Sequence, residues 1–229
     1  MLIPPMWWDR QPHTRTAEGE SRVVLLHGLG RSWHAMNPLA RRLHSAGFST
    51  LNLPYPSLVK PLDWILDYVD DRISQFAGNG PVHLVGHSLG GIISRMLIAR
   101  GPSWKPGRLV MMAPPNGGSE IIDWLSGKRV VKPFLSSAAR SLASDGVPAK
   151  LPPLPPGLEA IVIMGNRSSI PFFRKLLATD NDGIVSTEAG RIAGLKGFSV
   201  VDADHTFIQV HPETVRRTLA FLTTGASAD

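Results

Sequence analysis

The chain contains 229 residues, carries a formal net charge of +6 at pH 7, is 43% hydrophobic and 18% charged, and has no cysteine. This length suits a single α/β domain, and the balance of apolar and charged residues is that of a globular protein. The lack of cysteine excludes a disulfide framework and a thiol nucleophile. No apolar run reaches the length of about 18 residues that indicates a membrane-spanning helix.

The positive charge does not indicate a nucleic-acid partner. Basic residues occur as separate pairs on different predicted elements, and no stripe alternates basic with aromatic residues. We therefore expect a solvated surface, no nucleic-acid binding and no stable membrane insertion. Residues 1–8 are apolar, but they are too short for a secretory signal, lack a basic start and contain two prolines. The expected location is cytoplasmic, and the oligomeric state is left open.

Predicted strands and helices alternate along the chain. The alternation predicts one α/β domain over residues 1–229, with a mostly parallel sheet of about six strands and helices on both faces. Apolar β-branched runs predict strands at 22–27, 48–53, 81–87, 107–113, 158–164 and 197–202. Apolar residues at three- and four-residue spacing predict helices at about 33–46, 62–77, 89–100, 170–178 and 211–223.

The first predicted strand ends in the glycine-rich sequence His27-Gly28-Leu29-Gly30. Acyl transfer needs two N–H groups that point at the developing oxyanion, and one of them commonly comes from a loop of this kind. The simpler alternative is an ordinary glycine-rich turn between a strand and a helix. Together with the motif that follows, the sequence favours the amide of Leu29 as an oxyanion donor.

The third predicted strand runs directly into Gly86-His87-Ser88-Leu89-Gly90-Gly91, and a helix follows. A Gly-x-Ser-x-Gly motif between a strand and a helix is typical of a nucleophile elbow, a strained turn that exposes the serine hydroxyl. Glycines two residues before and after the serine let the strand and the helix approach closely. The motif predicts Ser88 as the nucleophile and the amide of Leu89 as the second oxyanion donor.

The general base is expected after the acid, because the chain order in such enzymes is serine, acid, histidine. Only His205 and His211 follow Ser88 at a distance. His205 stands where the last predicted strand breaks into a polar loop, the place where a sheet enzyme carries reactive groups. His211 precedes Pro212 and reads as the start of a helix. We predict His205 as the base.

Four aspartates compete for the role of the acid. Asp182 lies in a turn with Gly183 and is the best candidate to orient His205 and to stabilise its imidazolium. Asp180 is the second choice. Asp202 and Asp204 precede the histidine too closely to reach its ring from an extended loop, so we expect them to form local turn hydrogen bonds.

Residues 117–157 form a long connection between two predicted strands, far beyond the usual 2–6 residues. One interpretation is a helical cap or lid whose apolar face, including Trp124, covers an acyl pocket. The alternative is a covering helix followed by a proline-rich linker at 151–156, in which Leu151 and Leu154 pack on the domain. Trp33, just after the glycine-rich loop, is a further candidate for the pocket or a simple packing residue.

These motifs resemble those of the α/β-hydrolases, in particular the small bacterial lipases and esterases, and they occur in the family's order from about Val23 to Leu222. The segment Ala113–Ser119 differs from the lipase-like pattern, because Asn116 replaces a histidine, and we assign Asn116 to the substrate pocket. The resemblance implies hydrolysis of a small-molecule ester or lipid, with a short- to medium-chain acyl group, and no metal or cofactor.

Two other functions are compatible with the same residues. A thioesterase, amidase or acyltransferase would use the same triad on another leaving group or acceptor. A non-catalytic binding protein with this fold would usually lack a member of the triad.

Overall fold

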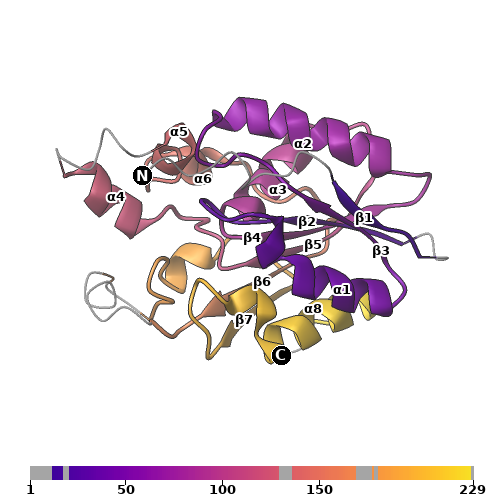
Figure 1. Cartoon of the computed structure of the whole chain (residues 1–229). Helices are drawn as coiled ribbons and strands as arrows, with labels where there is room; N and C mark the ends of the chain where they lie inside the picture. The colour runs from indigo at the N-terminus through magenta and orange to yellow at the C-terminus, as the bar shows by residue number, and fades with distance from the viewer. Residues whose placement is uncertain (1–11, 18–20, 129–135, 169–176, 178–179, 228–229) are drawn as a thin grey trace.

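The computed structural model describes residues 12–17, 21–128, 136–168, 177 and 180–227. Seven strands form one sheet in the order β1-β3-β2-β4-β5-β6-β7 (Figure 1). All neighbouring strands are parallel except the pair β1 and β3. The strands are β1 His13–Arg15, β2 Arg22–Leu26, β3 Ser49–Leu53, β4 Val82–His87, β5 Pro106–Met112, β6 Ala160–Gly165 and β7 Gly197–Val201.

The six predicted strands are confirmed to within two residues at each end. The sequence did not predict β1, because three residues without an apolar alternation carry no strand signal. β1 forms by pairing with the free edge of β3, with Thr14 opposite Leu51. Its existence depends on that tertiary contact.

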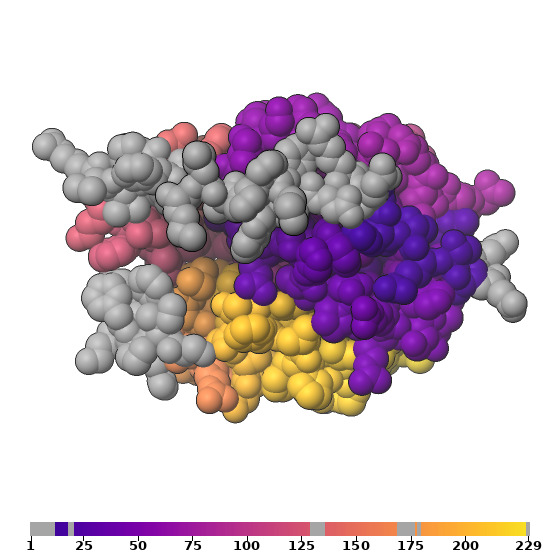
Figure 2. Space-filling model, viewed as in Figure 1, coloured from indigo at the N-terminus to yellow at the C-terminus, as the bar shows by residue number. Residues whose placement is uncertain are grey.

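Helices cover both faces of the sheet. α2 (Leu62–Phe76) and α3 (Leu89–Ala99) lie on one face, while α1 (Asn37–Ser45) and α8 (Pro212–Thr224) lie on the other (Figure 1). Figure 2 shows α1 and the yellow α8 side by side on one continuous surface. These four helices correspond to predicted ones. The predicted helix at 170–178 falls, except for Leu177, outside the described residues.

The core consists of two layers, because alternate residues of each buried strand point to opposite faces. In β2, Val24 and Leu26 pack with the α2 and α3 side, whereas Val23 and Leu25 pack with the α1 and α8 side. All four side chains are fully buried. Such continuous apolar runs are expected of parallel strands with both faces covered.

The strand order reverses between β2 and β4. After β2 the chain moves outward to β3, and after α2 it returns to β4 on the other side of β2. Where the connections after two neighbouring parallel strands lead in opposite directions, a crevice forms beyond the carboxyl ends of the strands. Ligands commonly bind in such a crevice. Leu26 pairs with Gly86 at this point, so the loop after β2 lies beside the loop after β4.

Residues 117–157, here called the insert, connect β5 to β6 and contain α4 (Glu120–Ser126), α5 (Ser137–Arg140) and α6 (Val147–Lys150). These helices lie beyond one end of the sheet (Figure 1). In the proline-rich part, Leu151 and Leu154 pack against the α2 and α3 side of the core, as the linker interpretation of 151–156 expected.

Candidate active site

Ser88 lies in a strained turn between β4 and α3. Its φ is 52° and its ψ is −119°, a backbone conformation that is uncommon for a residue with a side chain. A Cβ on Gly86 would lie 2.4 Å from the carbonyl carbon of Gly90, and one on Gly90 would lie 2.3 Å from the carbonyl oxygen of Leu26. Both positions therefore require glycine, and the strand–turn–helix context predicted for this motif is present.

Two loops from the other half of the sheet bring His205 and Asp182 to Ser88. The distance from His205 Nε2 to Ser88 Oγ is 3.0 Å, and the distance from His205 Nδ1 to Asp182 Oδ2 is 2.7 Å. Both side chains are shielded, with exposed fractions of 12% for His205 and 0% for Asp182. The structure therefore brings together the three residues that the sequence proposed as nucleophile, base and acid.

The second oxygen of the Asp182 carboxylate is occupied by backbone donors. Oδ1 accepts hydrogen bonds from the amides of Ile184 (3.0 Å) and Val185 (2.8 Å), which leaves Oδ2 to the imidazole. The amide of His205 also donates to the carbonyl of Asp182 at 3.0 Å. These bonds fix the carboxylate and the ring in one relative orientation.

The other aspartates lie elsewhere. Asp204 accepts from the amides of Thr206 (2.9 Å) and Phe207 (3.0 Å), which confirms the predicted local turn. Asp180 is exposed. His211 is the residue at which α8 begins, as predicted.

Leu29 and Leu89 follow β2 and β4, the two neighbouring strands that border the crevice. A tight turn carries Leu29: the amide of Arg31 donates to the carbonyl of Gly28 at 3.1 Å, and Gly30 has a φ of 67°. Leu89 is the first residue of α3, where helical N–H groups lack an intrahelical acceptor. Within the described part of the chain, neither amide has a hydrogen-bond acceptor.

Two buried histidines support these loops. His27 Nδ1 donates to the Gly28 carbonyl at 2.9 Å, its Nε2 accepts from the amide of Tyr55 at 3.4 Å, and its ring stacks on Tyr55 with centroids 3.9 Å apart. His87 Nε2 donates to the carbonyl of His205 at 2.8 Å. The sequence analysis gave neither residue this role, although each adjoins a predicted site residue at the end of a buried strand.

A cavity of about 280 Å³ is lined by Ser88 and His205. Most of its wall is apolar and comes from the segment that leads into the insert, from the insert itself and from the loop that carries Asp182: Pro115, Ile121, Ile122, Leu125, Leu142, Ile184 and Val185. Ser119 joins these two parts, because its hydroxyl donates to the carbonyl of Ile184 at 3.3 Å and accepts from the amide of Ile122 at 3.4 Å. Arg31 and Thr206 are among the polar lining residues.

The model of one protein family matches residues 23–218, which is most of the chain, and its description is the alpha/beta hydrolase family. The chain belongs to the alpha/beta hydrolase family. No curated protein sequence matches it. The turn at Ser88, the order of the motifs along the chain and the order of the strands in the sheet are those expected of the fold of that family.

Several solved structures resemble the hydrolase at low sequence identity. The mature lipase BlEst2 of Bacillus licheniformis superposes with a TM-score of 0.80 at 20% identity, covering 93% of this chain and 98% of that one. A monoacylglycerol lipase of Paleococcus ferrophilus gives a TM-score of 0.65 at 17% identity, covering 94% and 99%. A metagenomic carboxyl esterase superposes with a TM-score of 0.59 at 16% identity, covering 82% of this chain and 65% of that one. At these identities the likeness establishes the fold.

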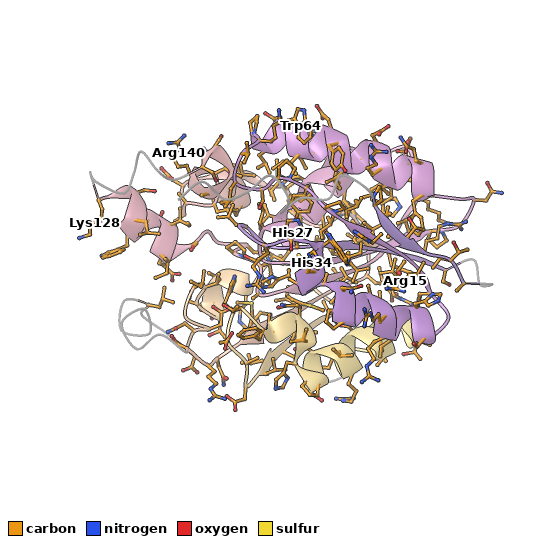
Figure 3. All side chains as sticks on the ribbon, in the orientation of Figure 1. Arg15, His27, His34, Trp64, Lys128 and Arg140 are labelled. Atoms are coloured by element: carbon orange, nitrogen blue, oxygen red, sulfur yellow. The ribbon has the colours of Figure 1, made fainter. Side chains whose placement is uncertain are left out.

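The three residues predicted for the substrate pocket do not line the cavity, and the tryptophans have other partners. Trp33 stacks on His13 of β1 and on His34, with centroids 3.4 and 3.8 Å apart. The Lys128 ammonium lies 4.8 Å from the centroid of the Trp124 ring, and Figure 3 shows Lys128 at the outer end of the insert, away from His27. Ile121, Ile122 and Leu125 of α4 line the cavity, whereas Trp124, on another side of the helix, is half-buried and does not.

Asn116 does not line the cavity either, because its buried side chain forms hydrogen bonds with α3 and with the segment around Gly190. Its Oδ1 accepts from Arg95 Nη1 at 2.9 Å, and its Nδ2 donates to the carbonyl of Gly190 at 2.8 Å. Arg95 Nη2 in turn donates to the carbonyl of Pro152 at 3.2 Å. An amide suits this position since it accepts from one neighbour and donates to the other.

A larger open depression, of about 770 Å³, lies at the amino ends of β4, β5 and β6, lined by Pro81, Pro106 and Glu159 among others. It lies at the opposite end of the strands from Ser88, and none of the described residues that line it is a serine or a threonine. We therefore assign the site to the smaller cavity. Among the described residues, no three histidine, aspartate or glutamate side chains gather as metal ligands, and no helix has the length and apolarity to cross a bilayer.

Burial of His27 makes the stability of the hydrolase depend on pH. Burial lowers the pKa of His27 to about 4, so the unfolded chain binds a proton below pH 6.5 that the folded chain does not. The free energy of unfolding is therefore expected to fall as the pH falls from 6.5 towards 4, by about 2 kcal/mol from this residue between pH 7 and 5.

Urea unfolding at pH 7 and pH 5 measures this effect as the difference between the protein and its His27→Asn variant. His34→Asn, at an exposed histidine, is the matched control and should keep the full pH dependence. An unchanged pH dependence in His27→Asn would contradict the assignment of a neutral buried imidazole.

Proposed function

We propose that the protein is a serine hydrolase that cleaves carboxylic esters through an acyl-enzyme. The observation that carries the proposal is the continuous set of hydrogen bonds from Ser88 Oγ through His205 to Asp182, at 3.0 and 2.7 Å. A serine, a base within hydrogen-bond reach and a third group that orients the base are the elements of nucleophilic catalysis. Ser88 faces a cavity that has room for a substrate.

In the first half of the reaction, Ser88 Oγ attacks the ester carbonyl while His205 Nε2 accepts its proton. The Asp182 carboxylate stabilises the imidazolium. The amides of Leu29 and Leu89 donate to the oxyanion of the tetrahedral intermediate. The intermediate collapses, the C–O bond to the alcohol breaks, and His205 protonates the departing alcohol.

In the second half, His205 removes a proton from water, which attacks the acyl-serine. The second tetrahedral intermediate then collapses and releases the carboxylic acid, and His205 returns the proton to Ser88 Oγ. Removal of one oxyanion donor typically costs about 10² to 10³ in kcat. The two amides therefore supply a large part of the expected acceleration.

The apolar wall of the cavity favours an acyl chain as the group bound there. Its volume of about 280 Å³ is near the lower end of ligand pockets, which favours short- to medium-chain esters. The insert forms much of this wall, and we propose that residues 117–157 act as the cap of the site.

Labelling with a neutral fluorophosphonate tests the proposal, with the modified residue read by mass spectrometry. We expect a stoichiometric adduct on Ser88 and a labelling rate at least 10³-fold lower in Asp182→Asn, since an asparagine amide favours the wrong tautomer of His205. Asp180→Asn, two residues away and exposed, should label at the rate of the unmodified protein.

No adduct on Ser88, or equal rates in the two variants, would contradict the proposal and favour a non-catalytic binding protein. With labelling established, 4-nitrophenyl esters, acyl thioesters and anilides compared as substrates separate an esterase from a thioesterase or amidase. Product analysis with added alcohol separates hydrolysis from acyl transfer.

A further inference from the structure

The charge distribution in the cavity is uneven. Among the fifteen described residues that line it, Arg31 is the one lysine or arginine, and none is an aspartate or a glutamate. The rest of the wall is mainly apolar. Arg31 thus brings one fixed positive charge to the wall of the cavity that Ser88 and His205 also line.

The backbone of Arg31 is held in place. Its amide closes the turn that presents Leu29, with a 3.1 Å hydrogen bond to Gly28. The side chain is half-buried, and its Nε is shielded from solvent without a hydrogen-bond acceptor in the described part of the chain. Burial is the main cause that lowers the pKa of His27 and of His87, and the positive charge of Arg31 lowers both pKa values further.

Each of the other described arginines that is buried or half-buried has at least one partner. Arg108 pairs with Glu159 at 2.8 Å, Arg217 pairs with Glu213 at 2.8 Å, and Arg95 donates to Asn116. For Arg31, no carboxylate among the described residues lies within the distance of an ion pair. A partly shielded cation without an anion is less favourable than a fully hydrated one, particularly where a second cation forms on His205 during the proposed reaction.

We propose that Arg31 is a specificity-determining residue and that the site prefers esters with an anionic oxygen group, carboxylate or phosphate, within a few atoms of the scissile carbonyl. The inference rests on the proposed function, because it names the substrate class of the same site. The anion would accept the unused guanidinium hydrogen bonds and neutralise the charge beside His205. Charge-assisted hydrogen bonds of this kind are about twice as strong as neutral ones.

Two matched pairs of substrates test the inference. The first pair, mono-4-nitrophenyl glutarate and its carboxamide analogue, differs by one charge in the acyl part. The second pair, 3-butyryloxy-4-nitrobenzoate and its carboxamide, differs by one charge in the alcohol part. Rates measured with Ser88→Ala are subtracted, because a neighbouring carboxylate accelerates spontaneous hydrolysis.

We expect kcat/KM to be about 10- to 100-fold higher for the anionic member of at least one pair, the range of a charge-assisted hydrogen bond. The pair that shows the preference identifies the half of the ester that carries the anion. In Arg31→Gln the ratio should fall to about one, and in Arg31→Lys part of it should remain. The preference should also weaken as the salt concentration is raised.

Arg42→Gln is the matched control, because it removes the same charge from an exposed position on α1 and should keep the ratio. Circular dichroism and the Tm establish that each variant is folded. A ratio near one in the unmodified protein for both pairs overturns the inference. A loss in Arg31→Gln that is equal for charged and neutral substrates also overturns it, and assigns Arg31 to the support of the oxyanion loop.

The failure of this inference is distinguishable from the failure of the proposed function. If the neutral carboxamide esters are hydrolysed in a Ser88-dependent reaction without charge preference, only the role of Arg31 is wrong. If neither member of either pair is hydrolysed and Ser88 remains unlabelled, the proposed function itself is wrong.

Discussion

Replacement of Ser88 by alanine is expected to lower kcat for a 4-nitrophenyl ester by about 10⁶, the scale seen when the serine of such a triad is removed. The contributions of His205 and Asp182 depend on the formation of the acyl-serine, so they are lost with the serine oxygen. The backbone strain at φ 52° is the same for alanine, and the loss of one hydroxyl leaves the core intact. The Tm should change by no more than a few degrees.

Steady-state kinetics and thermal unfolding of the same preparation measure both parts of this expectation. Ser45→Ala, at an exposed position near the end of α1, is the matched control and should retain full activity. A Ser88→Ala protein with more than about one hundredth of the original kcat would show that another nucleophile performs the reaction.

The Gly90→Ala substitution is expected to destabilise the fold by about 3 kcal/mol or more and to reduce activity strongly. Helix propensity alone predicts the opposite sign, because alanine is favoured over glycine by about 1 kcal/mol within a helix. Here the added Cβ would lie 2.3 Å from the carbonyl oxygen of Leu26. Since that atom belongs to a central strand, α3 must shift, and the shift moves Ser88 away from His205.

Urea unfolding of Gly90→Ala and Gly127→Ala gives the comparison. Gly127 ends α4 with a φ of −72°, and a Cβ there would contact its nearest neighbour at 3.5 Å, an ordinary distance. We expect Gly127→Ala to be neutral or slightly stabilising. If both variants were stabilised alike, the close approach of α3 to β2 would not exist in the protein.

The sequence predicted the parts of the fold and site that depend on local patterns. Buried parallel strands appear as apolar runs, and the motif around Ser88 determines its own turn because only glycine fits beside it. The positions of Asp182 and His205 followed from the order of elements along the chain. The structure brings both side chains to Ser88, while their catalytic roles stay predictions.

The pocket could not be predicted in the same way. Its lining is assembled from residues far apart in the sequence, such as Arg31, Leu142 and Ile184, and no local pattern specifies such a grouping. Trp33 is held by His13, a residue of the unpredicted strand β1. Asn116 was assigned by its place in a motif, whereas its actual neighbours, Arg95 and Gly190, are set by tertiary packing.

The buried Arg95 described above has a consequence for redesign of the molecule. It holds Asn116 at the entrance of the insert and Pro152 near its exit, and it belongs to α3, the helix that follows Ser88. Both ends of the insert are thus held by α3, so their positions relative to Ser88 do not depend on the chain between them. We expect that a replacement of the segment between Asn116 and Pro152 keeps its position relative to Ser88 if Arg95, Asn116 and Pro152 are retained.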